Sequence, residues 1–210
     1  MFSAGDKTYT YNDRGQQTGY SNGTTAAAYA YNPSGLRKAK TVGGSTKYFV
    51  YNGMNIVYEY SETAADVTLA QAKIQQKNRA KARFFYILRT ALDNSAQTVY
   101  NYDSTDLRSV TVTAVTADGV AYFYGLNRMH NSEGEIYVYN AHGDVVQLVK
   151  DNSVVASYTY DAFGNLTSQI GESDNPFLYC GEYYDAETQT YYLRARYYNP
   201  ANGRFTQQDA

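Results

Sequence analysis

Short stretches of alternating polar and apolar side chains recur along the chain, and each one runs into a turn. The clearest copy is YTYDAFGNL, which begins at Tyr158. Successive side chains of an extended strand alternate between faces, so Tyr158 and Tyr160 share one side. Asp161 can hydrogen-bond the backbone two residues ahead, and Gly164 can adopt a positive φ without steric cost. Because Leu166 resumes the apolar pattern, the stretch predicts a β-hairpin.

The same order of tyrosine, tyrosine, Asp or Asn and glycine is repeated at a regular spacing. Tyr11, Tyr31 and Tyr51 follow one another at intervals of 20 residues, and Tyr160 follows Tyr139 after 21. A fixed period indicates repeated hairpins, which bury a tyrosine face by stacking edge to edge. We therefore predict a mainly β fold of stacked antiparallel hairpins. The other copies are YTYNDRGQQ, YAYNPSGLR, YVYNAHGDV and the shorter YFVYNGMNI.

A denser motif follows the last copy. The run GEYYDAETQTYYLRARYYNPANGRFTQQD extends from Gly181 to Asp209. With the repeats, it resembles the YD repeats and repeat-associated core of the rearrangement-hotspot (Rhs) family, which itself resembles insecticidal toxin-complex shells and teneurins. The resemblance is strongest over residues 120–210 and looser over 1–60. Its motif positions are Tyr158, Tyr160, Asp161, Gly164, Tyr184, Asp185, Arg194, Arg196, Tyr197, Tyr198, Gly203, Arg204 and Phe205.

The resemblance implies a sheet that spirals into a hollow shell, closed at one end by the inward-curling core. It also implies that the shell encloses and presents a C-terminal effector, and that the parent protein is a secreted or cell-surface bacterial toxin. In the family this core takes part in an aspartate-centred self-cleavage, and Asp209 matches the aspartate after GRF. The sequence ends before the family's downstream motifs, so we expect a fragment of a longer protein without a complete cleavage site, and no enzyme activity.

The tyrosine ladders permit a second interpretation, an extracellular adhesive module that binds glycans or a cell-surface protein. Tyrosine serves well in contact patches, and the likeness to teneurins is compatible with adhesion. Glycan binding would leave rows of tyrosines exposed in a groove, whereas a shell would bury them between strands or along a curved wall. The sequence leaves both open.

Residues 61–119 interrupt the hairpin pattern. Residues 64–92 are rich in Ala, Gln, Lys and Arg and contain neither Gly nor Pro, which predicts a helical insertion, followed by a β-hairpin. This helix either lies solvated against the acidic remainder of the chain or docks on an acidic partner or membrane surface. We thus expect repeat hairpins in 1–60, the insertion in 61–119 and the core-like segment in 120–210. The insertion's basic residues are Lys73, Lys77, Arg79, Lys81, Arg83 and Arg89.

Composition agrees with the β class and narrows the partners. The chain has 25 tyrosines and no tryptophan, and 43% of its residues are apolar, enough for a sizeable core. A net charge of −2 gives no general footprint for nucleic acid. No run of about 20 apolar residues predicts a membrane span, and no targeting signal is visible. The open edges of an isolated sheet segment predict self-association.

Candidate chemistry is sparse. Cys180 is the only cysteine and His130 and His142 the only histidines, so no internal disulfide is available and no zinc-ligand spacing is visible. We interpret Cys180 as a small buried apolar residue in a strand-like context, and both histidines as turn residues, rather than as nucleophile and base. No phosphate-binding or EF-hand loop occurs, so we expect no cofactor and no metal.

Two arginines of the core-like run, Arg194 and Arg196, have a structural interpretation. We expect them to pair with Asp185 or Glu187 across a hairpin, or to stack on tyrosine rings of the same run.

Overall fold

The computed structural model describes residues 2–4, 6–62 and 119–207, which form two antiparallel sheets. The large sheet has 13 strands and the small sheet has 4, and the strand order in each follows the order of the chain. The mainly β class built of antiparallel hairpins is therefore confirmed. The predicted helix at 64–92, with its basic residues, lies outside the described residues.

The large sheet joins the two parts of the sequence that contain the repeats. Tyr58, in the last described strand before residue 63, pairs with Ala121, in the first described strand after residue 118. The three-part division of the chain remains a prediction. The strands are β1 (Phe2–Ala4), β2 (Lys7–Tyr11), β3 (Gln17–Ser21), β4 (Ala26–Tyr31), β5 (Arg37–Val42), β6 (Ser45–Asn52), β7 (Asn55–Glu62), β8 (Val120–Tyr124), β9 (Arg128–Asn131), β10 (Ile136–Tyr139), β11 (Val145–Lys150), β12 (Ser153–Tyr160) and β13 (Leu166–Gly171).

The turn residues act as the sequence predicts. After β12, Asp161 Oδ1 accepts hydrogen bonds from the backbone N–H groups of Phe163 at 2.8 Å and Asn165 at 2.9 Å. Gly164 has a φ of +89°, a conformation that side chains with a Cβ rarely adopt. The hairpin predicted from YTYDAFGNL is thus confirmed as β12 and β13.

A register shift at the end of each repeat hairpin defines one inward position. In the shift between Ala30 and Tyr31, Arg37 comes to lie opposite Tyr31. We call the second tyrosine of each repeat, such as Tyr31, the ladder tyrosine. Residues directly opposite each other share a face, so Arg37 lies on the same face of the sheet as this tyrosine. We call the position opposite the ladder tyrosine the inward position. It is occupied by Gln17, Arg37, Ile56, Arg128, Val145 and Leu166 in successive hairpins.

The ladder tyrosines connect each hairpin to the one before it. In each case the tyrosine hydroxyl donates a hydrogen bond to the backbone carbonyl of the preceding hairpin's inward residue. This regular contact explains why the second tyrosine recurs in the repeat. The pairs are Tyr31 with Gln17 (2.6 Å), Tyr51 with Arg37 (2.9 Å), Tyr124 with Ile56 (2.8 Å), Tyr139 with Arg128 (2.9 Å) and Tyr160 with Val145 (2.7 Å).

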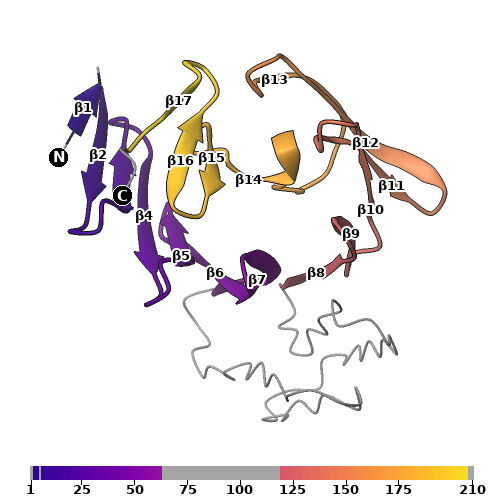
Figure 1. Ribbon diagram of the computed structural model, residues 1–210, viewed down its shortest axis with the longest axis horizontal. Coiled ribbons are helices and arrows are strands. Elements are labelled where there is room, and N and C mark those ends of the chain that lie inside the picture. Colours follow the sequence, from indigo (N-terminus) through magenta and orange to yellow (C-terminus); the bar gives the residue numbers. More distant parts are fainter. Residues whose placement is uncertain (1, 5, 63–118, 208–210) are drawn as a thin grey trace, which may run out of the picture.

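The small sheet lies inside the arc of the large sheet (Figure 1). It comprises β14 (Tyr183–Asp185), β15 (Thr190–Leu193), β16 (Arg196–Asn199) and β17 (Arg204–Phe205), and a 3-10 turn, η1 (Tyr179–Gly181), precedes it. Both sheets contribute to the main hydrophobic core, where Phe49 and Tyr122 of the arc join Tyr183 and Tyr192 of the small sheet. The small sheet therefore fills the concave side of the arc.

Candidate functional site

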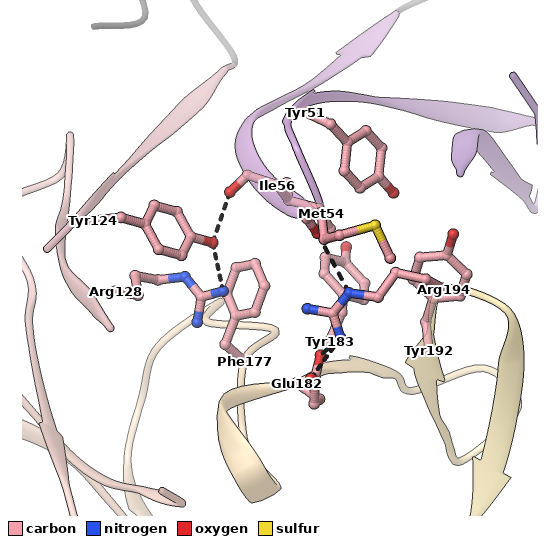
Figure 2. Close-up of a pocket in the computed structure, with 10 residues that line it drawn as sticks. All are labelled: Tyr51, Met54, Ile56, Tyr124, Arg128, Phe177, Glu182, Tyr183, Tyr192 and Arg194. Carbon is pink, nitrogen blue, oxygen red and sulfur yellow. Dashed lines mark hydrogen bonds and ion pairs between the residues drawn. The ribbon is translucent and has the colours of Figure 1, made fainter. Parts of the chain in front are cut away.

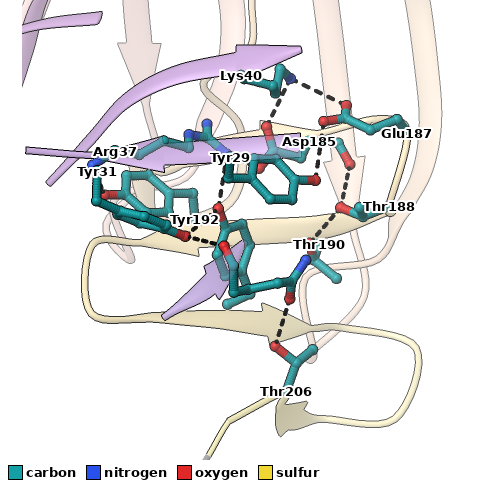
Figure 3. Close-up of polar contacts among 12 residues, drawn as sticks. Tyr29, Tyr31, Arg37, Lys40, Asp185, Glu187, Thr188, Thr190, Tyr192 and Thr206 are labelled. Atoms are coloured by element: carbon teal, nitrogen blue, oxygen red, sulfur yellow. Dashed lines mark hydrogen bonds and ion pairs between the residues drawn. The ribbon is translucent and has the colours of Figure 1, made fainter. Parts of the chain in front are cut away.

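A buried ion pair joins the two sheets. Arg37 on β5 and Asp185 on β14 have fully buried side chains, and Arg37 Nη1 donates to Asp185 Oδ2. Lys40 Nζ donates to the other carboxylate oxygen at 2.8 Å and to Glu187 at 3.1 Å (Figure 3). Lys40 lies opposite Tyr29 beyond the register shift, so both cations share the inner face of the arc. We call these four charged residues the inter-sheet lock.

Aromatic rings surround the Arg37 guanidinium. Its carbon atom lies 4.3 Å from the ring centre of Tyr192 and 4.9 Å from that of Phe49. The backbone N–H of Arg37 also donates to the Tyr192 hydroxyl at 2.7 Å. Among the described residues, Nε and Nη2 have no hydrogen-bond partner. A desolvated guanidinium is attracted to ring faces. The rings therefore provide part of the stabilisation that hydrogen bonds to Nε and Nη2 would give.

The lock holds Asp185 ionised. Burial by itself raises the pKa of this carboxyl, but the charges of Arg37 and Lys40 outweigh burial and lower the pKa below its usual value. The contact therefore consists of real charges at neutral pH. A buried carboxylate of this kind is strongly bound to its partners and poorly suited to proton transfer with a substrate.

A second arginine packs between the sheets on the other side of the arc. Arg128 on β9 places its guanidinium carbon 3.1 Å from the ring centre of Phe177. Its Nη2 donates to the Tyr124 hydroxyl at 2.8 Å (Figure 2). Its Nη1 donates to the Gly181 carbonyl at 3.3 Å. Within the described part of the chain, no carboxylate forms an ion pair with Arg128.

Arg194 and Arg196 depart from the predicted pairing. Arg194 donates to the carboxylate of Glu182 at 2.5 Å, and Asp185 is held by the arc instead. Arg196 stacks 3.6 Å from the ring centre of Phe205. The ion pairing expected with Asp185 or Glu187 is wrong, because Arg37 and Lys40 of β5 pair with these two carboxylates instead. The space between Arg128 and Arg194 measures only about 10 Å³, so this region is packed rather than hollow.

Cys180 also differs from its prediction, because it is exposed and lies in η1 with a φ of 53°. Its sulfur is 3.8 Å from His142 Nδ1, which is 2.9 Å from Asp144 Oδ1. Burial, with the charges of Asp144 and Glu182, raises the pKa of the thiol to about 11, so the thiolate is scarce at neutral pH. Sulfur and carboxylate also approach the same ring nitrogen, whereas a catalytic triad uses opposite nitrogens. The cluster is not arranged for nucleophilic catalysis.

The remaining motif residues are spread through both sheets rather than gathered in one site. Tyr158 is buried on β12, and Tyr197 is buried on β16. Tyr198 donates its hydroxyl to the Phe163 carbonyl at 2.9 Å. Asp209, the candidate for self-cleavage, lies outside the described residues. The others are Tyr184 on β14, Gly203 in the turn before β17 with a φ of 67°, and the exposed β17 residues Arg204 and Phe205.

Sequence reasoning missed Arg37, Lys40 and Arg128, and a signal for the first of them was present. Arg37 follows the repeat glycine by two residues, where other hairpins place Val145 or Leu166. A charged residue at a position otherwise filled by aliphatic side chains calls for a buried partner. Lys40 could not be found from alternation, because the register shift reverses the face that it occupies.

One surface feature remains beside the small sheet. A hollow of about 260 Å³ is lined mainly by aromatic side chains, and Cys180 lies at it. Its floor includes Tyr191, which donates its hydroxyl to the Gly164 carbonyl at 2.9 Å. The other lining residues are Tyr179, Glu182, Leu193, Tyr198 and Phe205.

No helix of the described residues has the length and apolar character needed to cross a membrane.

Comparisons with known proteins agree with this architecture. Residues 139–174 match the RHS Repeat family. The tRNA3(Ser)-specific nuclease WapA of Bacillus spizizenii is 34% identical over 191 residues, which is 87% of this chain and 6% of that protein. The tRNA nuclease WapA of Bacillus subtilis is 32% identical over 189 residues, with the same coverage of 87% and 6%. The chain thus spans only a small part of the length of these relatives.

Solved structures show the same fold at low sequence identity. TcdB2-TccC3 without its hypervariable C-terminal region matches with a TM-score of 0.57 and 15% identity, covering 98% of this chain and 9% of that one. A Photorhabdus luminescens Tc holotoxin pore matches with a TM-score of 0.54 and 13% identity, with the same coverage of 98% and 9%. The match to the RHS Repeat family and the similarity to the WapA proteins show that the chain belongs to the Rhs/YD-repeat family.

Proposed function

We propose that this segment forms part of the wall and inner closure of a YD-repeat shell that encloses and presents a C-terminal effector of a secreted or cell-surface toxin. The observation that carries the proposal is the inter-sheet lock. It fixes the small sheet on the concave side of the arc by buried charges (Figure 1), and just after β17 the Thr206 carbonyl accepts a hydrogen bond from Tyr11 of the arc at 3.0 Å.

The position of the tyrosines supports a wall. Tyr58 and Tyr122 are 2% exposed, and Tyr197 is 1% exposed, so ring faces lie between packed strands rather than along a solvent groove. At the ends of the sheet order stand β1 and β13, each paired on one side in the described part of the chain. Such edges can accept further hairpins of a longer wall, or pair with a second copy of an isolated segment.

Protease protection in the longer natural protein that carries this segment tests the proposal. We expect the region downstream of residue 210 to resist digestion in the unmodified protein and to be cut in an Arg37→Met variant, whose small sheet has lost its lock. Lys38→Met is the matched control, because Lys38 is an exposed cation of the same strand. If protease cuts the downstream region of all three proteins equally fast, the unmodified protein included, nothing is enclosed.

Self-cleavage of the longer protein is a separate part of the proposal, and Asp209 is its candidate residue. Intact mass measurements should give two fragments from the unmodified protein and one from an Asp209→Asn variant. A single uncleaved mass in both would leave this segment a passive scaffold. Within the segment itself we propose no enzyme activity.

An adhesive module is the second candidate, and the aromatic hollow beside the small sheet is the observation that favours it. Stacking on exposed tyrosines is a common means of recognising sugars and protein surfaces. Binding of the 210-residue chain to a glycan array, abolished by Tyr198→Ala and retained in Tyr20→Phe, would support this role. Tyr20 is a suitable control because it is buried in β3, away from the small sheet.

A further inference from the structure

Three side chains with metal-binding atoms meet where the arc touches η1. His142 and Asp144 belong to the turn between β10 and β11, and Cys180 belongs to η1, 38 residues after His142. The imidazole Nδ1, a carboxylate oxygen and the thiol sulfur all lie within 4.8 Å of one another. The cluster therefore brings together one nitrogen, one oxygen and one sulfur ligand from two separate segments of the chain.

The spacing of these atoms suits a single tetrahedral ion. Zinc lies about 2.0–2.3 Å from such ligands, which separates any two ligand atoms by roughly 3–4 Å. The sulfur of Cys180 is 3.8 Å from His142 Nδ1, and that nitrogen is 2.9 Å from Asp144 Oδ1. These two separations lie close to that range, and the sulfur and carboxylate oxygen are within 4.8 Å of each other, so the three atoms are near enough to share one ion.

The carboxylate is already held in place. Asp144 has a side chain only 8% exposed, and its Oδ2 accepts a hydrogen bond from Asn140 Nδ2 at 2.7 Å. Its Oδ1 accepts another from the Cys180 backbone N–H at 2.8 Å. Hydrogen bonds that orient a ligating carboxylate are a regular part of metal sites. Asp144 is thus oriented by both segments that supply the other ligands.

The local charge and access favour a cation. Among the described residues Asp144 pairs with no lysine or arginine. The His142 side chain is 57% exposed and Cys180 is exposed, so an ion can reach the ligands from solvent. The Asp144 carboxylate attracts a divalent ion, and a coordinated thiol gives up its proton to solvent.

We propose that His142, Asp144 and Cys180 form a zinc site, with water as the fourth ligand, that ties the β10–β11 turn of the arc to η1. Zinc binds histidine nitrogen, carboxylate oxygen and cysteine sulfur, which are the three ligand atoms present here. The bound ion would fix η1, which leads into the small sheet. The inter-sheet lock holds the small sheet itself to the arc. This inference does not depend on whether the parent protein encloses an effector.

Titration of the metal-free 210-residue chain with zinc, followed by calorimetry, tests the site. We expect one zinc per chain. Loss of an outer-shell partner weakens metal binding by about 10–100-fold, so removing a ligand in Cys180→Ala or His142→Ala should weaken it at least about tenfold. Cys180→Ala keeps the backbone N–H that binds Asp144, and circular dichroism should show an unchanged fold. Glu172→Gln, which removes an exposed carboxylate elsewhere, should bind zinc as the unmodified chain does.

Cobalt(II) provides the spectroscopic test. The unmodified chain should show a thiolate-to-cobalt charge-transfer band, and Cys180→Ala should lack it. Zinc should also raise the thermal midpoint of the unmodified chain and leave that of Cys180→Ala unchanged, because only a ligand that binds the folded state stabilises it. The proposal is overturned by absent zinc binding, by equal affinity in the unmodified chain and Cys180→Ala, or by an absent thiolate band.

Discussion

The two halves of the arc hold the small sheet by different means, although they use the same position of the repeat. Arg37 and Arg128 both occupy the inward position opposite a ladder tyrosine. Arg37 meets the buried carboxylate of Asp185, whereas the hydrogen bonds of Arg128 in the described part go to uncharged oxygens. One contact is a charge lock and the other is mainly ring packing. Equal residues at equal positions therefore need not contribute equally to stability.

Replacing Arg37 by methionine should produce the largest loss. Ile56 and Val145 occupy the equivalent position in other hairpins, so an aliphatic side chain fits the wall. The variant nevertheless leaves Asp185 buried beside Lys40 alone, and breaking a buried ion pair costs about 3–5 kcal/mol. Urea unfolding followed by circular dichroism measures the change.

Two further variants decide whether the stranded charge is the cause. Lys38→Met should alter the free energy of unfolding by no more than about 0.5 kcal/mol, as expected for an exposed side chain. The double variant Arg37→Met with Asp185→Leu should be more stable than Arg37→Met alone, because it removes the unpaired carboxylate. A double variant less stable than the single one would contradict the charge lock.

Acid should weaken the inter-sheet lock and leave the contact between Arg128 and the Phe177 ring unchanged. The pKa of Asp185 is lowered in the folded state, so its stabilising contribution is complete above the ordinary value of 3.8. The contribution is lost as the pH falls below 3.8 toward the folded-state pKa. The difference in unfolding free energy between the unmodified chain and Asp185→Asn should therefore shrink below this pH. A constant difference down to pH 2 would exclude the linkage.

The turn glycines extend the comparison to the two halves of the arc. Gly164 has a φ of +89°, and an added Cβ would lie 2.5 Å from the Tyr179 ring, whereas at Gly15, with a φ of +71°, it would meet nothing within 4 Å. Gly15→Ala should cost about 1–2 kcal/mol from backbone strain alone. Gly164→Ala should cost about 1–3 kcal/mol more, because overpacking adds to the strain. Thermal unfolding of both variants measures the two losses of stability. Equal losses would show that the Tyr179 ring adds no steric cost at Gly164.

Arg128→Met should give a smaller loss than Arg37→Met, about 1–2 kcal/mol. It removes the hydrogen bond to the Tyr124 hydroxyl and the contact with the Phe177 ring, but strands no carboxylate among the described residues. Urea unfolding beside Arg37→Met gives the comparison directly. A loss as large as that of Arg37→Met would show that the two halves grip the small sheet alike.

Local chemistry made the hairpins predictable. Asp161 and Gly164 form their turn with bonds that reach no further than Asn165, so nine residues of sequence contain the necessary information. The inter-sheet lock lacks this property, because Asp185 meets Arg37 from 148 residues away. The tyrosine pattern showed that stacked strands were needed but not which acid would meet which base.

Cys180 illustrates the same limit on a smaller scale. Its place between Tyr179 and Gly181 reads as a strand-like context, which predicted a buried position. The chain instead turns at Cys180, where the backbone N–H bonds Asp144 of the arc. A contact outside the local segment therefore decided the conformation, and it also placed the thiol beside His142.

The sequential strand order has a consequence for biosynthesis. Each arc hairpin pairs with its immediate neighbours and can form as the ribosome releases it, whereas the small sheet is made after all the described strands of the arc. At about 5–20 residues per second, the interval between Arg37 and Asp185 lasts roughly 7–30 seconds. During that time the concave face of the nascent arc, with its rings and its cation, is open to the cytosol. Translation of the small sheet thus ends a period in which this part of the arc is most vulnerable to aggregation.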